Sequence, residues 1–309
     1  MTDLITIILP FFALVVMGFI ATRFALLDSA GVHGLNRFVY YFALPALLFS
    51  KMAETPFEKV LLENTFMLAL LVAGSIVFVL GWIAAKLLFR AKSDKAAIMA
   101  LAGCYGNIGF LGIPVLVTVL GQSVAAPLSI MVLIDVAILI PFATSIIDVS
   151  RTGGLRPHML GDISLSIAKN PLIVSIIVGL LFSASGLGLP HFIGGFSNLL
   201  GQAAAPAAMF ALGAVLAGRP LSDGLGEASL ISILKLAVHP LVMWGAMTLF
   251  GVSPDWRLAA TLGAATPVGA ALFVIAQEYD AMPKRASTAV VISTAVALIS
   301  LPVLISWLT

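Results

Sequence analysis

Charged residues are scarce in this chain, and their scarcity excludes most classes of soluble protein. Only 10% of the 309 residues are Asp, Glu, Lys or Arg, whereas 61% are hydrophobic. Soluble domains carry about 25% charged residues, so this composition indicates a polytopic membrane protein. The net charge of +2 comes from dispersed groups that form no basic stripe and no charged tail, which excludes nucleic-acid binding.

Cysteines and catalytic motifs are also nearly missing. The single cysteine, Cys104, excludes an intramolecular disulfide, and its small apolar neighbours favour a packing role over a reactive thiol. No Gly-x-Ser-x-Gly motif, Walker loop or cluster of metal ligands occurs, so we expect no enzyme, no metal site and no cofactor. The amino terminus lacks a basic segment and a cleavage site, so its apolar run predicts a spanning helix rather than a signal peptide.

Long apolar runs, by contrast, recur along the whole chain. Each has roughly 17 to 25 residues, the length that crosses a hydrocarbon core of about 30 Å. We count ten, and the sequence therefore predicts an all-α membrane protein with ten transmembrane helices. The expected spans are 4–22, 35–51, 65–89, 96–120, 124–147, 163–183, 197–217, 229–250, 257–277 and 286–308.

The distribution of Lys and Arg predicts the orientation of these spans. Of the 16 Lys and Arg residues, twelve fall in loops on one side of the membrane, three fall on the other side, and Lys235 lies inside the eighth span. By the positive-inside rule, both termini are expected on the extracytoplasmic side. The twelve are Arg23, Arg37, Lys86, Arg90, Lys92, Lys95, Arg151, Arg156, Lys169, Arg219, Lys284 and Arg285, and the three are Lys51, Lys59 and Arg257.

The second half of the chain repeats special residues of the first half at a shift of 161 residues. The aligned pairs are Pro10 with Pro171, Pro45 with Pro206, Pro141 with Pro302, Gly18 with Gly179, Gly34 with Gly195 and Phe49 with Phe210. Each repeat would hold five helices, and an odd number makes the second copy enter the membrane from the opposite face. We therefore expect a first repeat at 1–148, a cytoplasmic linker at 149–161 and an inverted second repeat at 162–309.

Two of the expected helices contain residues that weaken a helix at membrane depth. In the fourth helix, residues 104–114 include three glycines, an asparagine and a proline, and residues 263–270 interrupt the corresponding ninth helix. Thr266 is expected to cap a new half-helix there, beginning at Pro267. Paired breaks in an inverted repeat point to a substrate site near the midplane. The expected substrate-binding residues are Gly106, Asn107, Ile108, Gly109, Pro114, Thr266, Pro267, Val268 and Gly269.

Polar residues inside the apolar runs are the remaining candidates. Asn107 could bind substrate through its amide or cap the second half-helix, and the two roles can coexist. Asp135 is the only acid well inside a span, where burial favours its protonated form, so it is either a proton-coupling group or a hydrogen-bonded structural residue. Lys235 and His239 are four residues apart on one helix face and could balance an anionic substrate or pair with Asp135. Alternatively, Lys235 extends to the membrane surface and His239 contacts backbone freed by Pro240.

Together these motifs resemble the auxin efflux carrier family. The resemblance rests on Gly-Asn-x-Gly-x-x-Gly-x-Pro at 106–114, on Leu44-Pro45, on Thr266-Pro267 and on the ten-helix duplicated plan. It implies a fold similar to bile-acid symporters and sodium/proton antiporters, in which helices 4 and 9 cross at their breaks. It also implies scaffold and transport domains, each drawn from both repeats, that move as an elevator.

The resemblance extends to individual residues and has two departures. The family's helix 4 asparagine corresponds to Asn107, and its helix 4 and helix 9 prolines correspond to Pro114 and Pro267. The long cytoplasmic loop of the plant members is missing, since only about 148–162 remains, and no acid occurs in helix 3. The family includes plant auxin exporters and bacterial members described as malonate or malate permeases.

The sequence therefore favours a secondary carrier of small organic anions, such as carboxylates, embedded in the lipid bilayer of a bacterial-type inner (plasma) membrane. Protons are the expected coupling ion, since a second obvious acid for a sodium site is missing. A homodimer is one assembly that the sequence allows. The alternative from another class is a membrane sensor that binds the same ligand without transporting it.

Overall fold

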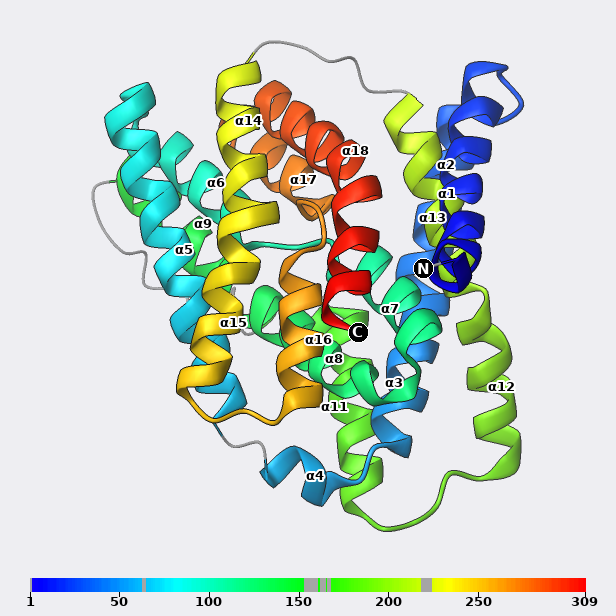
Figure 1. Ribbon diagram of the computed structural model, residues 1–309. Coiled ribbons are helices and arrows are strands. Elements are labelled where there is room, and N and C mark those ends of the chain that lie inside the picture. Colours follow the sequence, from blue (N-terminus) through cyan, green and yellow to red (C-terminus); the bar gives the residue numbers. More distant parts are fainter. Residues whose placement is uncertain (1, 63–64, 153–160, 162–164, 166–167, 218–223) are drawn as a thin grey trace. The chain divides into compact units, whose positions relative to one another are not determined.

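The computed structural model describes residues 2–62, 65–152, 161, 165, 168–217 and 224–309 (Figure 1). In these ranges all regular elements are helices, apart from one isolated bridge between Gly106 and Val268. Most of the expected linker 149–161 lies outside the described residues, as do Arg156 and Arg219, which the orientation argument used.

The chain forms two compact units, and each unit takes segments from both halves of the sequence. Unit 1 comprises Met1–Asn64, Gly109–Leu133 and Ala168–Arg219, and unit 2 comprises Thr65–Ile108, Ile134–Ile167 and Pro220–Thr309. The π-helical turn η2 (Ile108–Gly112) carries the chain from unit 2 into unit 1.

Unit 1 contains the first helices of each half of the chain together with the helices between residues 109 and 133. Its elements are α1 (Thr2–Arg23), α2 (Ser29–Phe38), η1 (Val39–Ala43), α3 (Leu44–Glu54), α4 (Phe57–Leu62), α7 (Ile113–Leu120), η3 (Gln122–Val124), most of α8 (Ala125–Ile134), α11 (Pro171–Ala184), α12 (His191–Gln202) and α13 (Ala204–Ala217).

Unit 2 contains the remaining helices, including both segments of the ninth expected span. Its elements are α5 (Phe66–Phe89), α6 (Ser93–Cys104), η4 (Asp135–Leu139), α9 (Ile140–Thr152), α14 (Leu225–Ile233), η5 (Leu234–Val238), α15 (His239–Leu249), α16 (Pro254–Ala264), α17 (Ala271–Glu278) and α18 (Pro283–Leu308).

Most helices overlap the expected apolar runs, although α2 begins before one run and α4 lies between two, and the all-helical membrane class is confirmed. Among the described residues, five helical stretches are long and apolar enough to cross a membrane: Phe66–Phe89, Gln122–Arg151, His191–Ala217, Leu225–Leu249 and Pro283–Leu308. Three shorter apolar helices occupy Ala13–Arg23, Ile108–Leu120 and Pro171–Ala184. The helix α11 begins later than the expected residue 163 because Asn170 accepts bonds from the N–H groups of Leu172 and Ile173, with Pro171 in the first turn.

Prolines widen four helices of the two units locally. Each described π-helical turn is followed by a proline at the second residue of the next helix. Proline has no N–H and its ring clashes with the carbonyl four residues earlier, so the hydrogen-bond ladder shifts by one residue. The four pairs are η1 with Pro45, η2 with Pro114, η4 with Pro141, and η5 with Pro240. Two of these turns carry Asp135 and Lys235.

Glycines allow two pairs of helices in unit 1 to approach closely. A Cβ added at Gly18 of α1 would lie 2.0 Å from the carbonyl oxygen of Phe210 in α13. One added at Gly179 of α11 would lie 2.8 Å from the carbonyl oxygen of Phe49 in α3. Both glycines are therefore required by backbone contact, and the two contacts use residues that the shift of 161 aligns.

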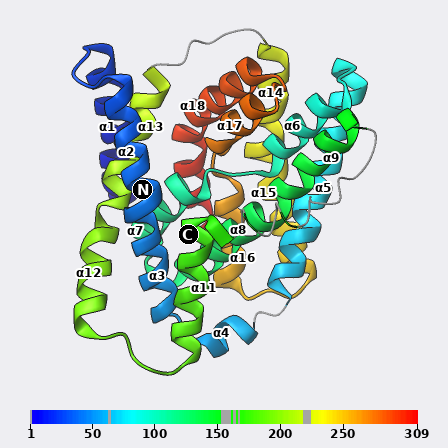
Figure 2. The ribbon, with the colours of Figure 1, turned by 180° about the vertical axis from the view of Figure 1, so that it is seen from behind.

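The core of unit 2 is built around the alanine-rich helix α6 (Figure 2). Its residues from Ala96 to Cys104 are all buried, and α5, α9, α14, α17 and α18 contribute to the same apolar cluster. At Gly81 of α5, an added Cβ would lie 3.0 Å from the Cα of Ala100, so the two backbones almost touch. This packing fixes the end of α6, where the candidate site begins.

Candidate functional site at the crossing of two broken helices

Both expected helix breaks are present. Helix α6 ends at Cys104 before η2 begins at Ile108, and α16 is separated from α17 by residues 265–270. The predictions that residues 104–114 and 263–270 interrupt their helices are therefore confirmed.

The two non-helical segments of unit 2 pair with each other in antiparallel fashion. The N–H of Asn107 donates to the carbonyl of Pro267 at 2.8 Å, and the N–H of Gly269 donates to the carbonyl of Tyr105 at 3.1 Å. These bonds flank the bridge between Gly106 and Val268. Backbone groups released by the breaks thus satisfy each other, as the interior of a membrane protein requires.

Two glycines are needed for this close crossing. A Cβ at Gly106 would lie 2.6 Å from the Oγ1 of Thr266 and 3.2 Å from the Nζ of Lys235. At Gly269, a Cβ would lie 2.2 Å from the Cε1 of Tyr105. Any larger residue at either position would push the two segments apart.

The expected capping role of Thr266 is wrong. Its hydroxyl donates to the carbonyl of Gly263 at 2.7 Å, so it satisfies the carboxyl end of α16 rather than the amino end of α17. The second half-helix begins at Ala271 rather than at Pro267. The carbonyl of Pro267 is instead used in the backbone pairing with Asn107.

One residue that stabilises the crossing was missed by the sequence analysis. The N–H of Val268 donates to the Oγ of Ser293 in α18 at 3.1 Å, and this hydroxyl in turn donates to the carbonyl of Val290 at 3.2 Å. The only sequence signal was a hydroxyl inside the apolar run 286–308, which is too common a feature to single out one serine.

Lys235 extends to the crossing rather than to the membrane surface. Its side chain is fully buried, and its Nζ donates to the carbonyl of Ala264 and lies 3.3 Å from the Nδ1 of His239. Ala264 is the last residue of α16, so this carbonyl is one that the helix break leaves without an intrahelical partner. A cation there also complements the negative end of the helix dipole.

The side chain of Asp135 reaches Gly106 of the crossing. Its side chain is buried, with 7% of the residue exposed, and its carboxylate accepts a hydrogen bond from the N–H of Gly106. The Asp135 and Lys235 side chains interact electrostatically, although neither belongs to an ion pair within the described ranges. Gly106 therefore lies near both a carboxylate and an ammonium group.

Asn107 presents an amide that protein groups leave unused. The residue is 4% exposed, and its backbone N–H is committed to Pro267. Its side-chain amide makes no hydrogen bond to any other residue in the part of the chain that the structure describes. Since buried amides are normally paired, this group is available to a ligand.

Most of the expected site residues belong to one unit, and two belong to the other. Gly106, Asn107, Ile108, Asp135, Lys235, His239 and residues 266–269 all belong to unit 2. Gly109 and Pro114 belong to unit 1, where Pro114 lines a separate cavity. Cys104 is buried, and its Sγ lies 3.5 Å from the carbonyls of Ala100 and Leu101, consistent with the expected packing role.

Known proteins resemble this chain over nearly its whole length. The family profile described as "Membrane transport protein" matches residues 3–305. A Rhizobium meliloti protein named "Putative malonate transporter" is 32% identical over 296 residues, which cover 95% of this chain and 92% of that protein. The "Uncharacterized transporter YfdV" of Escherichia coli is 24% identical, with 93% of this chain and 91% of that protein covered. "Auxin efflux carrier component 6" of Arabidopsis thaliana is 30% identical over 48% of this chain and 26% of its own length.

This chain belongs to the auxin efflux carrier family of membrane transport proteins. Membership confirms the resemblance seen in the sequence motifs and the prediction of a transporter rather than an enzyme. An auxin efflux carrier family member is a multi-pass membrane protein, which agrees with the apolar helices described above.

The crossing gives this auxin efflux carrier family member a defined chemical capacity. An unused amide and a buried ammonium group belong to the crossing, where Gly106 and Gly269 let the two backbone segments approach closely. These are donors suited to a carboxylate, and the nearby Asp135 is a carboxylate that can accept a proton.

Proposed function

We propose that this chain is a secondary active carrier of small organic anions, with carboxylates such as malonate as its cargo. The observation that carries the proposal is that the Asn107 amide, which no other described residue uses, and the fully buried ammonium group of Lys235 both belong to the crossing. The relative named as a malonate transporter supports the choice of a small dicarboxylate as the test substrate.

The charge on Lys235 is the feature that favours an anion over a neutral cargo. Burying an ammonium group costs several kcal/mol unless partners compensate it. In the described residues its recorded polar partners are a carbonyl oxygen and an imidazole nitrogen, and no carboxylate lies within ion-pair distance. Asp135 interacts with Lys235 only at a longer distance, so a bound carboxylate at the crossing would add a negative charge beside the ammonium group, together with hydrogen-bond acceptors for Asn107.

The proposed architecture is two inverted five-helix repeats, with a scaffold domain and a transport domain that move as an elevator. The contact of Gly18 with Phe210 and that of Gly179 with Phe49 support the repeat, because the shift of 161 converts one contact into the other. The two compact units support the domains, because each unit draws on both halves of the chain. In this proposal unit 1 is the scaffold, unit 2 carries the cargo, and both termini are extracytoplasmic.

Asp135 is proposed to couple transport to protons. Its side chain interacts electrostatically with that of Lys235, and both lie near Gly106, so a proton on Asp135 changes the charge that an anionic cargo meets. The carboxylate also accepts a bond from a backbone N–H of the crossing itself, which supports a proton-coupling role close to the proposed cargo site.

Reconstituted flux of labelled malonate tests these roles. Wild-type protein in liposomes should accumulate malonate, with uptake that depends on pH and not on sodium. Asn107→Ala should raise KM by about 2- to 10-fold, the loss of a net hydrogen bond worth 0.5–1.5 kcal/mol. Asp135→Asn should abolish the pH dependence.

Three results would separate the components of the proposal. An unchanged affinity in Asn107→Ala would make Asn107 a helix cap and not a ligand. Uptake that is indifferent to pH, and that Asp135→Asn leaves unaltered, would remove the proton role. Binding in detergent without flux in liposomes would make the protein a sensor.

A further inference from the structure

Unit 1 contains a polar cavity that the crossing does not use. Its volume is about 310 Å³, and it lies between α3, α7 and the junction of α12 with α13. This volume is near the lower end of the roughly 300–1,000 Å³ of ligand pockets, which suits a small molecule. The polar lining residues are Lys51, Thr118, Gln122, Asn198 and Gln202, and the remaining lining is Leu47, Pro114, Val117, Gly201 and Ala205.

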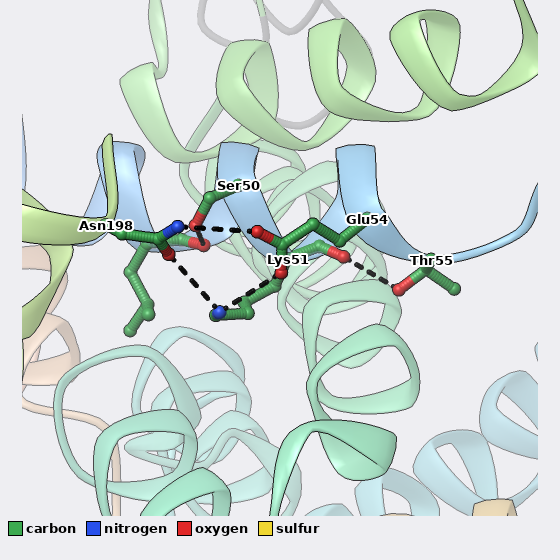
Figure 3. A network of polar contacts seen from close by, with 6 residues as sticks. Ser50, Lys51, Glu54, Thr55 and Asn198 are labelled. Carbon is green, nitrogen blue, oxygen red and sulfur yellow. Dashed lines mark hydrogen bonds and ion pairs between the residues drawn. The ribbon is translucent and has the colours of Figure 1, made fainter. Parts of the chain in front are cut away.

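Lys51 is the cationic group of this cavity, and it belongs to a small network (Figure 3). Its Nζ lies 3.3 Å from Glu54 and donates to the Oδ1 of Asn198 at 3.5 Å, while the Nδ2 of Asn198 donates to Glu54 at 3.5 Å. The Lys51 side chain is only 11% exposed, whereas that of Glu54 is 42% exposed. The ammonium group therefore lies inside, and the carboxylate that balances it lies in contact with solvent.

The network holds the ammonium group loosely. Distances of 3.3–3.5 Å are long for hydrogen bonds to charged groups, which are usually below 3 Å. An ammonium group has three donors, and only two are engaged with Glu54 and Asn198. A stronger or better-placed anion can therefore replace Glu54 as the partner of Lys51.

Two exposed glutamines also line the cavity. The side-chain amides of Gln122 and Gln202 make no hydrogen bond to another residue within the described parts of the chain. Gly201 brings these groups together, because a Cβ at that position would lie 3.0 Å from the Cα of Leu47, so α12 packs directly on α3. Asn198 lies one turn before Gly201 in α12, so the packing of α12 on α3 places Asn198 beside Lys51.

We propose that this cavity is a second anion site, which takes a small carboxylate through Lys51, Asn198 and the two glutamine amides. Glu54 is the competitor that occupies the ammonium group when the carboxylate is absent. This inference rests on the proposed carboxylate cargo, and it adds a docking site in unit 1 that is separate from the crossing in unit 2.

Cysteine protection in the full-length protein tests the proposal. Ala205→Cys adds a thiol to the cavity lining without removing a polar group, and the native Cys104 is buried and gives a low background. We expect malonate to slow modification of this thiol by a water-soluble thiol reagent several-fold, and the neutral analogue malonamide to have no effect. Equal protection by malonamide, or none by malonate, overturns the proposal.

Paired charge variants distinguish a ligand site from a structural ion pair. In the Ala205→Cys background, Lys51→Gln should weaken protection at least tenfold and Lys51→Arg should largely restore it. Glu54→Gln should strengthen protection several-fold, because the competitor is gone. If Lys51 and Glu54 formed only a structural ion pair, both Lys51→Gln and Glu54→Gln would weaken protection. That result rejects the site. Glu58→Gln, which removes an exposed acid from the adjacent helix α4, is the matched control and should change nothing.

A third variant separates this site from the crossing. Protection of the Ala205→Cys thiol should survive Asn107→Ala, and its loss there would assign the effect to the crossing and overturn the second site. Flux and protection can also fail independently. Liposomes that show no malonate flux while protection persists reject the carrier function and leave the anion site standing.

Discussion

The fully buried Lys235 and the largely buried Lys51 have different partners for their charges. Lys235 in unit 2 is fully buried, bonds to a backbone carbonyl and has no described carboxylate within ion-pair distance. Lys51 in unit 1 is 11% exposed and faces Glu54 at 3.3 Å. The first ammonium group is fixed by the fold and lacks a full countercharge, whereas the second has a side-chain countercharge that can move away.

This difference indicates a division of roles. A fixed, undercompensated cation gives strong and selective attraction for an anion, at a cost that the fold must bear. A compensated cation near solvent gives weaker attraction and easy exchange. We therefore expect the crossing to determine affinity and transport, and the cavity of unit 1 to assist access.

Replacing Lys235 should produce the largest effect. In Lys235→Met the cation is lost, and the carbonyl of Ala264 loses a charged hydrogen bond worth about 1.5–3 kcal/mol. Malonate uptake in liposomes should fall by about 10- to 100-fold. Lys284→Met removes an exposed lysine from the first turn of α18 and is the control. Uptake equal to that of the control would refute the role assigned to Lys235.

Closing the crossing with a methyl group should have the next largest effect. Gly106→Ala places a Cβ 2.6 Å from Thr266 and 3.2 Å from the Nζ of Lys235, so it should destabilise unit 2 by about 1–3 kcal/mol. Gly201→Ala in unit 1 meets Leu47 at 3.0–3.3 Å, farther than the 2.6 Å contact at Gly106, and should cost less. Gly245→Ala has open space in a helix and should raise stability by up to about 1 kcal/mol. Melting temperatures that do not follow this order would contradict the tight crossing.

Removing the hydroxyl that anchors the crossing should have a moderate effect. Ser293→Ala leaves the buried N–H of Val268 without its partner, at a cost of about 1–3 kcal/mol. The control is Ser306→Ala in the same helix, because Ser306 is exposed and donates only to the carbonyl of Val303. Thermal unfolding should separate the two variants by several degrees, and equal melting temperatures would mean that Ser293 does not anchor the crossing.

The contrast between the lysines also shows how far the sequence could predict the site. Asn107, Asp135, Lys235 and His239 stood out because polar groups are costly in apolar spans. The contact of Lys235 with Ala264 could not be predicted, since it depends on the widened turn η5 and on where α16 ends. Lys51 was counted only as a loop charge, because the packing of Gly201 on Leu47 that forms its cavity joins residues far apart in sequence.

The wrong prediction of a capping role for Thr266 also arose because a tertiary contact decides the local structure. Local sequence favoured a cap followed by a proline, which is a good start for a half-helix. The tertiary pairing of Asn107 with Pro267 takes the backbone carbonyl of that proline, and the second half-helix begins only at Ala271. Local propensity is therefore overruled at the place where two distant segments meet.

Breaking a surface ion pair that is not part of the unit 1 cavity should give the smallest effect. Asp94 and Arg151 in unit 2 lie 3.3 Å apart at the surface, with side chains that are 19% and 39% exposed. Burial of the Asp94 carboxyl acts to raise its pKa, but the N–H of Lys95 and the guanidinium group of Arg151 outweigh burial, so the pKa lies below its usual value of 3.8.

The stability that this pair adds should be present above the usual pKa and lost as the pH falls through the lowered one. Asp94→Asn should cost about 0–1 kcal/mol at pH 7, measured by thermal unfolding, and the difference from wild type should vanish at strongly acidic pH. Unlike Glu54→Gln, it should leave malonate protection of the cavity thiol unchanged, because no cavity group competes for Arg151. If Asp94→Asn altered protection as Glu54→Gln does, the effect would come from general charge rather than from the cavity.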